Sequence, residues 1–212
     1  SFDNYSVLYV DTERNLKDQY IYALQQIKIK AGFAIDEKLP NFDFISLIDV
    51  SRDKRFDVLK KYLEHIRTEF DNHVFIVLDV LTDCVSNFND VKESLKLIDL
   101  LNVMINKYDV TFLCVIHENP TDSSNKARGH LGTEIMNKAS CQIQIGFEKD
   151  ANHKDTDILK VNYLKTRVGR KPEPFHLQYC ETEKGLVLAS SADINNAIDS
   201  RKNKADLASV KT

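Results

Sequence analysis

The feature that most constrains the fold is a short apolar run at residues 73–79, with the sequence HVFIVLD. Five consecutive apolar residues, rich in β-branched side chains, lead directly into the carboxylate of Asp79. Such a run predicts a strand buried on both faces, as in a parallel sheet. Ligands of open α/β sheets bind at the carboxyl ends of the strands. Asp79 is therefore either a cation-binding carboxylate or the start of an ordinary acidic turn.

Similar apolar segments alternate with helical patterns through the first half of the chain. We expect strands at residues 6–11, 42–48, 74–78 and 110–116. We expect helices from just after Glu13 to about Ala31, at residues 52–70, and at residues 90–107. The first helix should turn inward Leu16, Tyr20, Ala23, Ile27 and Ala31, and the third Val91, Leu95, Ile98, Leu101 and Ile105. This order predicts an α/β fold whose parallel sheet has helices on both faces.

The second half of the chain has a different pattern. Residues 118–128 are rich in Pro, Asp, Ser, Asn and Gly, which indicates a long exposed loop. A short helix at 131–139 and a strand at 141–147 follow, and then a charged turn at 148–157. Three more strands, at 158–164, 174–179 and 186–189, have no helices between them. We expect antiparallel additions at one sheet edge, which gives one domain at 1–190 and a C-terminal helix or tail at 191–212.

Composition excludes several classes of protein. The 212 residues suit one α/β domain, and the net charge of −3 shows no global basic excess, so any DNA contact must be local. The four cysteines are widely spaced and indicate free thiols of a cytoplasmic protein rather than a disulfide framework or a zinc site. No apolar run is long enough to cross a membrane, and the start of the chain is not a signal peptide.

Polar side chains follow several of the predicted strands at the point where each ends. Asp11 and Glu13 follow the first strand, Asp79 the third, and His117 with Asn119 the fourth. A basic cluster follows a later strand and comprises Lys165, Arg167, Arg170 and Lys171. One polar strand end means little, but several at the same sheet edge predict a site.

Five segments in this order and spacing resemble the RecA/DnaB-like ATPase core, in particular the RepA-type hexameric helicases and related mobile-element ATPases. The segments are VLYVDTE, FIVLD, FLCVIHEN, ARGHLGTEIMNKASCQIQI and VNYLKTRVG. The resemblance extends from about Ser6 to Ala189 and implies a RecA-like three-layer core. It also implies ATP and Mg²⁺ as cofactors, DNA in single-stranded form as a partner, and a homo-oligomer such as a hexamer. The function implied is a motor or loader in replication or mobilisation.

The resemblance assigns roles to the acidic strand ends. Glu13 matches the carboxylate that polarises the attacking water, whereas the alternative is that Asp11, Thr12 and Glu13 only cap the first helix. Asp79 matches the Walker B aspartate, a ligand of Mg²⁺. Asp11 is placed with Asp79 among the residues that bind the cofactor.

The remaining polar positions match other parts of the family's site. His117 matches the sensor that contacts the γ-phosphate, with Asn119 beside it, and the alternative is a surface imidazole. Lys165 and Arg167 match a pair that reaches the nucleotide of a neighbouring subunit, and the alternative is a basic hairpin tip.

A DNA-contacting loop of the relatives corresponds to residues 119–128 of this chain. Lys126 and Arg128 suit phosphate contacts there, but Asp122 lies in the same segment, and a solvated loop explains the composition equally well. Gly129 and Gly132 are expected to serve the turn into the short helix.

The sequence departs from the family at one motif, because it contains no G-x-x-x-x-G-K-[ST] phosphate-binding loop. That loop supplies the backbone cradle for the phosphates. We expect it to precede this segment in a longer parent protein, and we expect the 212-residue chain alone to hydrolyse ATP poorly or not at all. The alternatives are a non-catalytic RecA-like scaffold or partner-binding domain, and an unrelated doubly wound enzyme that uses Asp79 and His117 on a small substrate.

Overall fold

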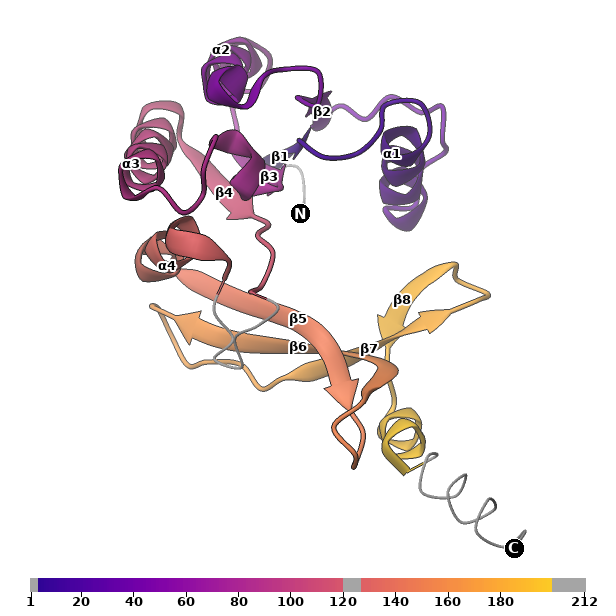
Figure 1. Ribbon diagram of the computed structural model, residues 1–212. Helices are drawn as coiled ribbons and strands as arrows, with labels where there is room; N and C mark the ends of the chain where they lie inside the picture. The colour runs from indigo at the N-terminus through magenta and orange to yellow at the C-terminus, as the bar shows by residue number, and fades with distance from the viewer. Residues whose placement is uncertain (1–3, 120–126, 200–212) are drawn as a thin grey trace, which may run out of the picture. The chain divides into compact units, whose positions relative to one another are not determined.

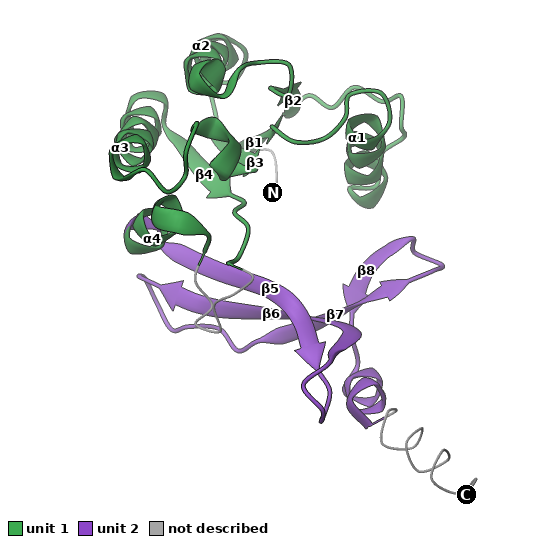
Figure 2. Cartoon of the chain, in the orientation of Figure 1, with its two compact units in different colours: residues 1–137 green, residues 138–212 purple. Residues whose placement is uncertain are grey.

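The computed structural model describes residues 4–119 and 127–199, and the chain divides into two compact units. Residues 1–137 form the first unit and residues 138–212 the second (Figure 2). Each unit contains one four-stranded sheet, parallel in the first and antiparallel in the second.

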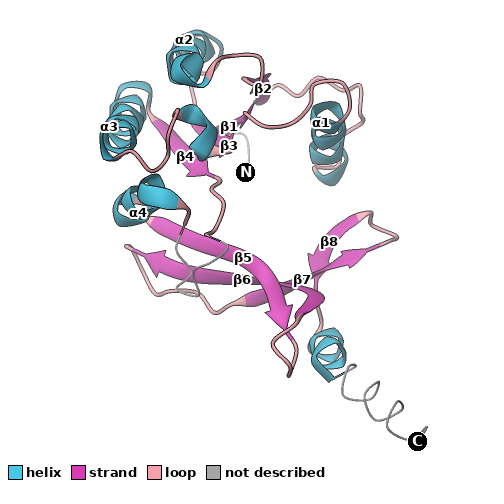
Figure 3. Cartoon of the chain, viewed as in Figure 1, coloured by secondary structure: helices cyan, strands magenta, loops and turns pink. Residues whose placement is uncertain are grey.

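The first unit alternates strands and helices, as the sequence predicts (Figures 1 and 3). Its elements are β1 (Tyr5–Asp11), α1 (Gln19–Lys30), β2 (Phe42–Ser46), α2 (Arg52–Glu69), β3 (His73–Asp79), the short 3₁₀ helix η2 (Leu81–Cys84), α3 (Val91–Tyr108), β4 (Val110–Cys114) and α4 (Gly129–Lys138). The sheet has the order β2-β1-β3-β4, and all three pairings are parallel. The predicted α/β class is therefore confirmed.

Helices lie on both faces of the parallel sheet. α2 and α3 lie along one face (Figure 1), where Leu8 of β1 and Ile76 of β3 are fully buried with Leu63 of α2. α1 lies on the other face, because its Tyr20 ring stacks on Tyr9 of β1 with ring centroids 6.3 Å apart. The sheet thus forms the middle layer of three, and β1 and β3 are its two central strands.

The observed helix ends and faces correct two expectations. α1 begins at Gln19 with Asp18 as its N-cap, so Leu16 lies in the preceding turn and not on a helical face. α3 begins after Asp90, whose carboxylate accepts the N–H of Glu93 at 2.9 Å, as predicted. Its buried face, however, comprises Ser94, Leu97, Ile98, Leu101, Met104 and Tyr108. Of the five residues predicted to face inward, Ile98 and Leu101 are buried, but Val91, Leu95 and Ile105 are exposed, because this helix is apolar on two sides and periodicity alone does not decide between them.

The second unit is an antiparallel sheet in the order β5-β6-β7-β8. Its strands are β5 (Cys141–Lys149), β6 (Asp155–Thr166), β7 (Phe175–Cys180) and β8 (Gly185–Leu188). The four strands form a sheet of their own, and the charged turn is shorter than predicted. It spans residues 150–154, where Asp150 accepts the N–H groups of Asn152 and Lys154, both at 2.9 Å. Residues 191–199 are helical.

No helix within the described ranges 4–119 and 127–199 is long and apolar enough to cross a membrane.

Candidate active site at the carboxyl edge of the parallel sheet

The two acidic strand ends predicted from the sequence lie side by side. Asp11 and Asp79 are direct register partners where the neighbouring strands β1 and β3 end. The chain beyond them stays joined, because the Thr12 N–H donates to the Asp79 carbonyl at 2.8 Å. The Thr12 hydroxyl also donates to the Val80 carbonyl at 2.9 Å and accepts the Val80 N–H at 2.8 Å. The peptide bond between Asp79 and Val80 is cis. Thr12, Asp79 and Val80 thus form a hydrogen-bonded platform that joins the two strand ends.

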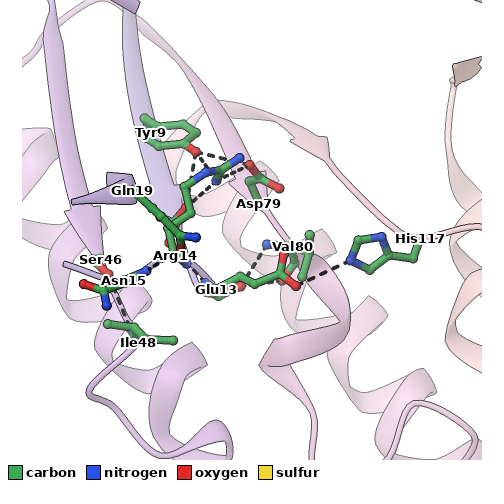
Figure 4. Close-up of polar contacts among 12 residues, drawn as sticks. Tyr9, Glu13, Arg14, Asn15, Gln19, Ser46, Ile48, Asp79, Val80 and His117 are labelled. Carbon is green, nitrogen blue, oxygen red and sulfur yellow. Dashed lines mark hydrogen bonds and ion pairs between the residues drawn. The ribbon is translucent and has the colours of Figure 1, made fainter. Parts of the chain in front are cut away.

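A guanidinium bridges the two carboxylates (Figure 4). Nη1 of Arg14 lies 2.5 Å from Asp11 Oδ2 and 2.7 Å from Asp79 Oδ2. The same nitrogen donates to the Tyr9 hydroxyl at 2.6 Å. That hydroxyl lies 3.1 Å from Asp79 Oδ2 and 3.3 Å from Asp11 Oδ2. Burial raises the pKa of Tyr9, and the negative charge of Asp79 raises it further, so the hydroxyl remains a protonated donor.

Asp11 shapes the turn that follows β1. Its side chain is fully buried, and its Oδ1 accepts the backbone N–H groups of Glu13 at 3.1 Å and Arg14 at 2.8 Å. Its Oδ2 lies within hydrogen-bond distance of Tyr9 and Arg14. Both oxygens are therefore engaged inside the protein, which offsets the cost of burying the charge. The predicted contact of Asp11 with the cofactor remains a prediction.

Glu13 points away from this bridge, toward the fourth strand end. Its Oε1 lies 3.7 Å from Nε2 of His117, and both side chains are about half exposed, at 53% and 54% (Figure 4). His117 follows β4, as the strand-end argument predicted. An exposed carboxylate beside an imidazole can take a proton from a water molecule that reaches it from solvent. The two predicted catalytic residues of the first unit are thus brought together.

Arg55 supports the platform through hydrogen bonds to the main chain around it. Its side chain is 94% buried, which is unusual for a charged group. From α2 it donates to the carbonyls of Thr12 and Asp83, both at 3.0 Å, and to that of Val50 at 2.9 Å. A buried guanidinium that donates to several carbonyls ties distant loops together. Arg55 therefore connects the turn after β1 to η2, the 3₁₀ helix that begins two residues beyond Asp79.

The carboxylates of Asp11 and Asp79 are the candidate ligands for a divalent cation. Mg²⁺ is held by oxygen ligands, usually one or two carboxylates together with waters and phosphates. Asp79 fits, because its carboxylate is 14% exposed at the edge of the platform, whereas Asp11 does not, since both its oxygens are engaged and buried. Within the described parts of the chain, no three His, Cys, Asp or Glu side chains gather as a metal site. A cation would therefore bind through Asp79 and non-protein ligands.

The structure describes one of the two predicted DNA-contacting residues. Lys126 lies outside the described residues, and Arg128 lies just before α4. The Arg128 guanidinium sits over the ring of Phe88, 4.9 Å from its centroid, and its backbone N–H donates to the His117 carbonyl at 2.9 Å. Gly129 has a φ of +73°, and a Cβ there would lie 2.5 Å from the Phe88 ring, so this turn requires glycine. Asn119 is half-buried at the end of the segment after β4.

The basic pair predicted to act on a nucleotide belongs to the second unit. Lys165 lies within β6, opposite Gln142 of β5. Arg167 follows that strand and is exposed, and its backbone N–H donates to the Ser140 carbonyl at 2.9 Å. The structure thus places the pair at one end of the antiparallel sheet, and its role toward a nucleotide remains a prediction.

Three residues that contact the carboxylate pair or the turn after β1 could not be identified from the sequence. Tyr9 reads as one more apolar strand position, and Arg14 as one charge in a polar turn. Arg55 lies in a run of charged residues at the start of a helix, which normally indicates a solvated face. A weak signal existed only for Tyr9, since it shares a strand face with Asp11, two residues on.

Comparison with known proteins establishes the fold. No protein-family model matches this sequence, and no curated protein matches it. Among solved structures, the chain resembles the ATPase domain of G40P with a TM-score of 0.60 and 14% identity, over 87% of this chain and 75% of that one. It also resembles the RadB recombinase with a TM-score of 0.55 and 15% identity, over 88% and 80% of the two chains. The chain therefore has a RecA/DnaB-like core.

Proposed function

We propose that this RecA/DnaB-like core belongs to an NTP-hydrolysing motor that acts on DNA, as a helicase or a helicase loader. ATP and Mg²⁺ would be its cofactors, and a ring of identical subunits, such as a hexamer, its assembly. The role would lie in the replication or mobilisation of a mobile genetic element. Support comes from the fold shared with the ATPase domain of G40P and the RadB recombinase, and from the chemistry of one sheet edge.

The observation that carries the proposal is the placement of three acidic side chains and one imidazole at one edge. Asp11 and Asp79 end neighbouring strands in register, and Glu13 reaches the His117 side chain from the turn after β1. In open α/β sheets this edge is where ligands bind. An isolated acidic turn would not require partners from β1, β3 and β4 at the same place.

Glu13 would act on the attacking water. Its carboxylate is exposed enough to meet water, and Asp11 fixes its backbone through the N–H at 3.1 Å. His117 lies on the far side of that carboxylate and would orient it, while its ring remains accessible to a phosphate oxygen. Positioning a water in this way is the main task of the protein in phosphoryl transfer.

Other residues would deal with charge. When bound, a divalent cation neutralises the charge that develops on the phosphates. Asp79 would hold it, and Arg167, with Lys165, would supply positive charge to the nucleotide of a neighbouring subunit. Arg128 and Lys126 would contact DNA phosphates. Asp11 and Asn119 would complete the nucleotide-binding residues.

The test compares two glutamate substitutions in the complete protein that the gene encodes. Glu13→Gln should leave nucleotide binding intact and reduce ATP turnover by about 10²-fold or more, because a positioned base is lost. Glu181→Gln is the matched control, since Glu181 is exposed in the turn between β7 and β8. Turnover and binding of a fluorescent ATP analogue are measured for both. An unchanged rate in Glu13→Gln would show that Glu13 only shapes the turn.

A further inference from the structure

Arg14 holds the carboxylate pair through one nitrogen. Nη1 makes all three short contacts of the guanidinium, to Tyr9, Asp11 and Asp79. A nitrogen with two hydrogens cannot serve three acceptors fully, and this end-on arrangement lacks the two parallel hydrogen bonds of a bidentate pair. The side chain is also 35% exposed. The guanidinium is therefore positioned between the two carboxylates but is only partly constrained there.

Asp79 has one strong cation beside it in this arrangement. The Asp79 oxygen that receives Arg14 also lies within 3.1 Å of the Tyr9 hydroxyl. A second cation at the same carboxylate would lie close to a guanidinium of like charge, at a partly buried place where screening is reduced. The two cations therefore oppose each other at Asp79.

We propose that Arg14 is the resident counter-ion of Asp79 and that a divalent cation binds Asp79 only as the Arg14 side chain leaves it. The inference rests on the proposed role of Asp79 as the cation ligand. It makes Arg14 a positioning residue, because it acts on the site through Asp79. The nucleotide-free protein would keep the carboxylate pair neutralised by its own side chain.

The turn is built so that Arg14 can leave without unravelling it. Asp11 Oδ1 accepts the backbone N–H groups of Glu13 and Arg14, and neither bond involves the Arg14 side chain. The backbone of Thr12 is held separately by Asp79 and Arg55. A swing of the guanidinium toward solvent would therefore leave Glu13 in position.

The experiment measures the affinity of the protein for Mn²⁺, which replaces Mg²⁺ because it is paramagnetic. Binding is followed by the loss of the electron paramagnetic resonance signal of unbound Mn²⁺ as protein is added. The wild-type protein, Arg14→Gln and Arg52→Gln are compared. Arg14→Gln should bind Mn²⁺ about tenfold more tightly than the wild type, because the competing charge is gone. Mn²⁺ should also raise the melting temperature of Arg14→Gln more than that of the wild type.

Arg52→Gln is the matched control for net charge. Arg52 pairs with Asp83 at 3.0 Å and is half exposed, so its loss removes the same charge without touching Asp79. Its Mn²⁺ affinity should stay within about twofold of the wild type. Equal tightening in both variants would overturn the proposal, since the effect would then be a long-range one. A purely structural role for Arg14 would weaken binding or leave it unchanged.

A second variant decides the matter if Arg14→Gln does not fold. Tyr9→Phe keeps every charge and removes the hydroxyl that accepts from Arg14 at 2.6 Å. It should loosen Arg14 and tighten Mn²⁺ about two- to threefold, and no tightening would overturn the proposal. Asp79→Asn separates the two hypotheses. If Asp79→Asn binds Mn²⁺ more weakly than the wild type but the Arg14 and Tyr9 variants bind it equally well, only the competition by Arg14 is disproved. If Asp79→Asn also binds Mn²⁺ as the wild type does, the proposed role of Asp79 as a cation ligand is disproved too.

Discussion

The two sheets of this chain obtain their order in different ways. In the parallel sheet, Leu8, Ile76 and Leu78 have no exposed surface, and helices cover both faces. In the antiparallel sheet, the buried apolar side chains of the described residues are Ile158 and Val161. Ile145 is 61% exposed and Leu188 72% exposed. The parallel sheet carries its own core, whereas the antiparallel sheet leaves much apolar surface in contact with solvent.

The antiparallel sheet nevertheless has two distinct faces. Register partners in antiparallel strands share a face, so Ile145 lies with Val161 and Phe175. The opposite face carries polar side chains, including Lys160 opposite His176. The proposed catalytic residues Glu13 and His117 therefore belong to the unit with the larger buried core, which can hold their side chains in precise positions.

The largest expected effect breaks the core of the parallel sheet. Ile76→Ala should lower the free energy of unfolding by about 2–5 kcal/mol, because Ile76 is fully buried and a cavity would remain. Ile145→Ala, the same change on the antiparallel sheet, should alter it by less than about 0.5 kcal/mol. Urea denaturation followed by circular dichroism gives both values. Similar losses for the two variants would mean that Ile145 is covered in solution, and the contrast between the sheets would disappear.

A smaller effect is expected where the core of the first unit meets the site. Arg55→Met should cost about 2 kcal/mol, because it leaves the carbonyls of Thr12 and Asp83 without their buried donor. Arg52→Met, three residues earlier on α2, removes only a half-exposed ion pair and should cost less than about 1 kcal/mol. The same denaturation measurement applies. Equal costs would show that Arg55 does not support the platform.

The smallest effect concerns the polar face of the antiparallel sheet. Burial raises the pKa of Glu148, but hydrogen bonds from His176 at 2.8 Å and Lys160 at 3.0 Å outweigh it, so the pKa lies below the ordinary 4.5. Because the folded pKa is lowered, the stabilisation is complete above pH 4.5 and is lost as the pH falls below that value. As the pH is lowered below 4.5, the melting temperature of Glu148→Gln should fall less steeply than that of the wild type. Glu181→Gln, exposed in a turn, should follow the wild type.

The sequence predicted the parts of the fold that depend on local pattern. Apolar runs located β1, β3 and β4, and the helix expected at residues 52–70 corresponds to α2 (Arg52–Glu69). Strand-end logic also placed Asp11 beside Asp79, and Glu13 near His117. These succeed because period and strand ends are properties of short segments.

The misses involve residues whose importance comes from distant partners. Arg14 matters because Asp79, far along the chain, ends the adjacent strand, and Arg55 because three separate loops present carbonyls to it. No local pattern encodes either arrangement. The start of α1 differs from the expected one for a related reason. Asp11 accepts the N–H groups of Glu13 and Arg14 in the turn after β1, and the helix begins only at Gln19.

The paired hydrogen bonds between Thr12 and Val80 have a mechanical consequence. They couple the segment that carries Glu13 to the segment that follows Asp79, so neither loop can shift alone without breaking these two hydrogen bonds. Arg55 connects the same turn to Asp83, which lies in η2. A displacement of one segment would therefore cost hydrogen bonds at the other, and the ends of β1 and β3 are mechanically coupled.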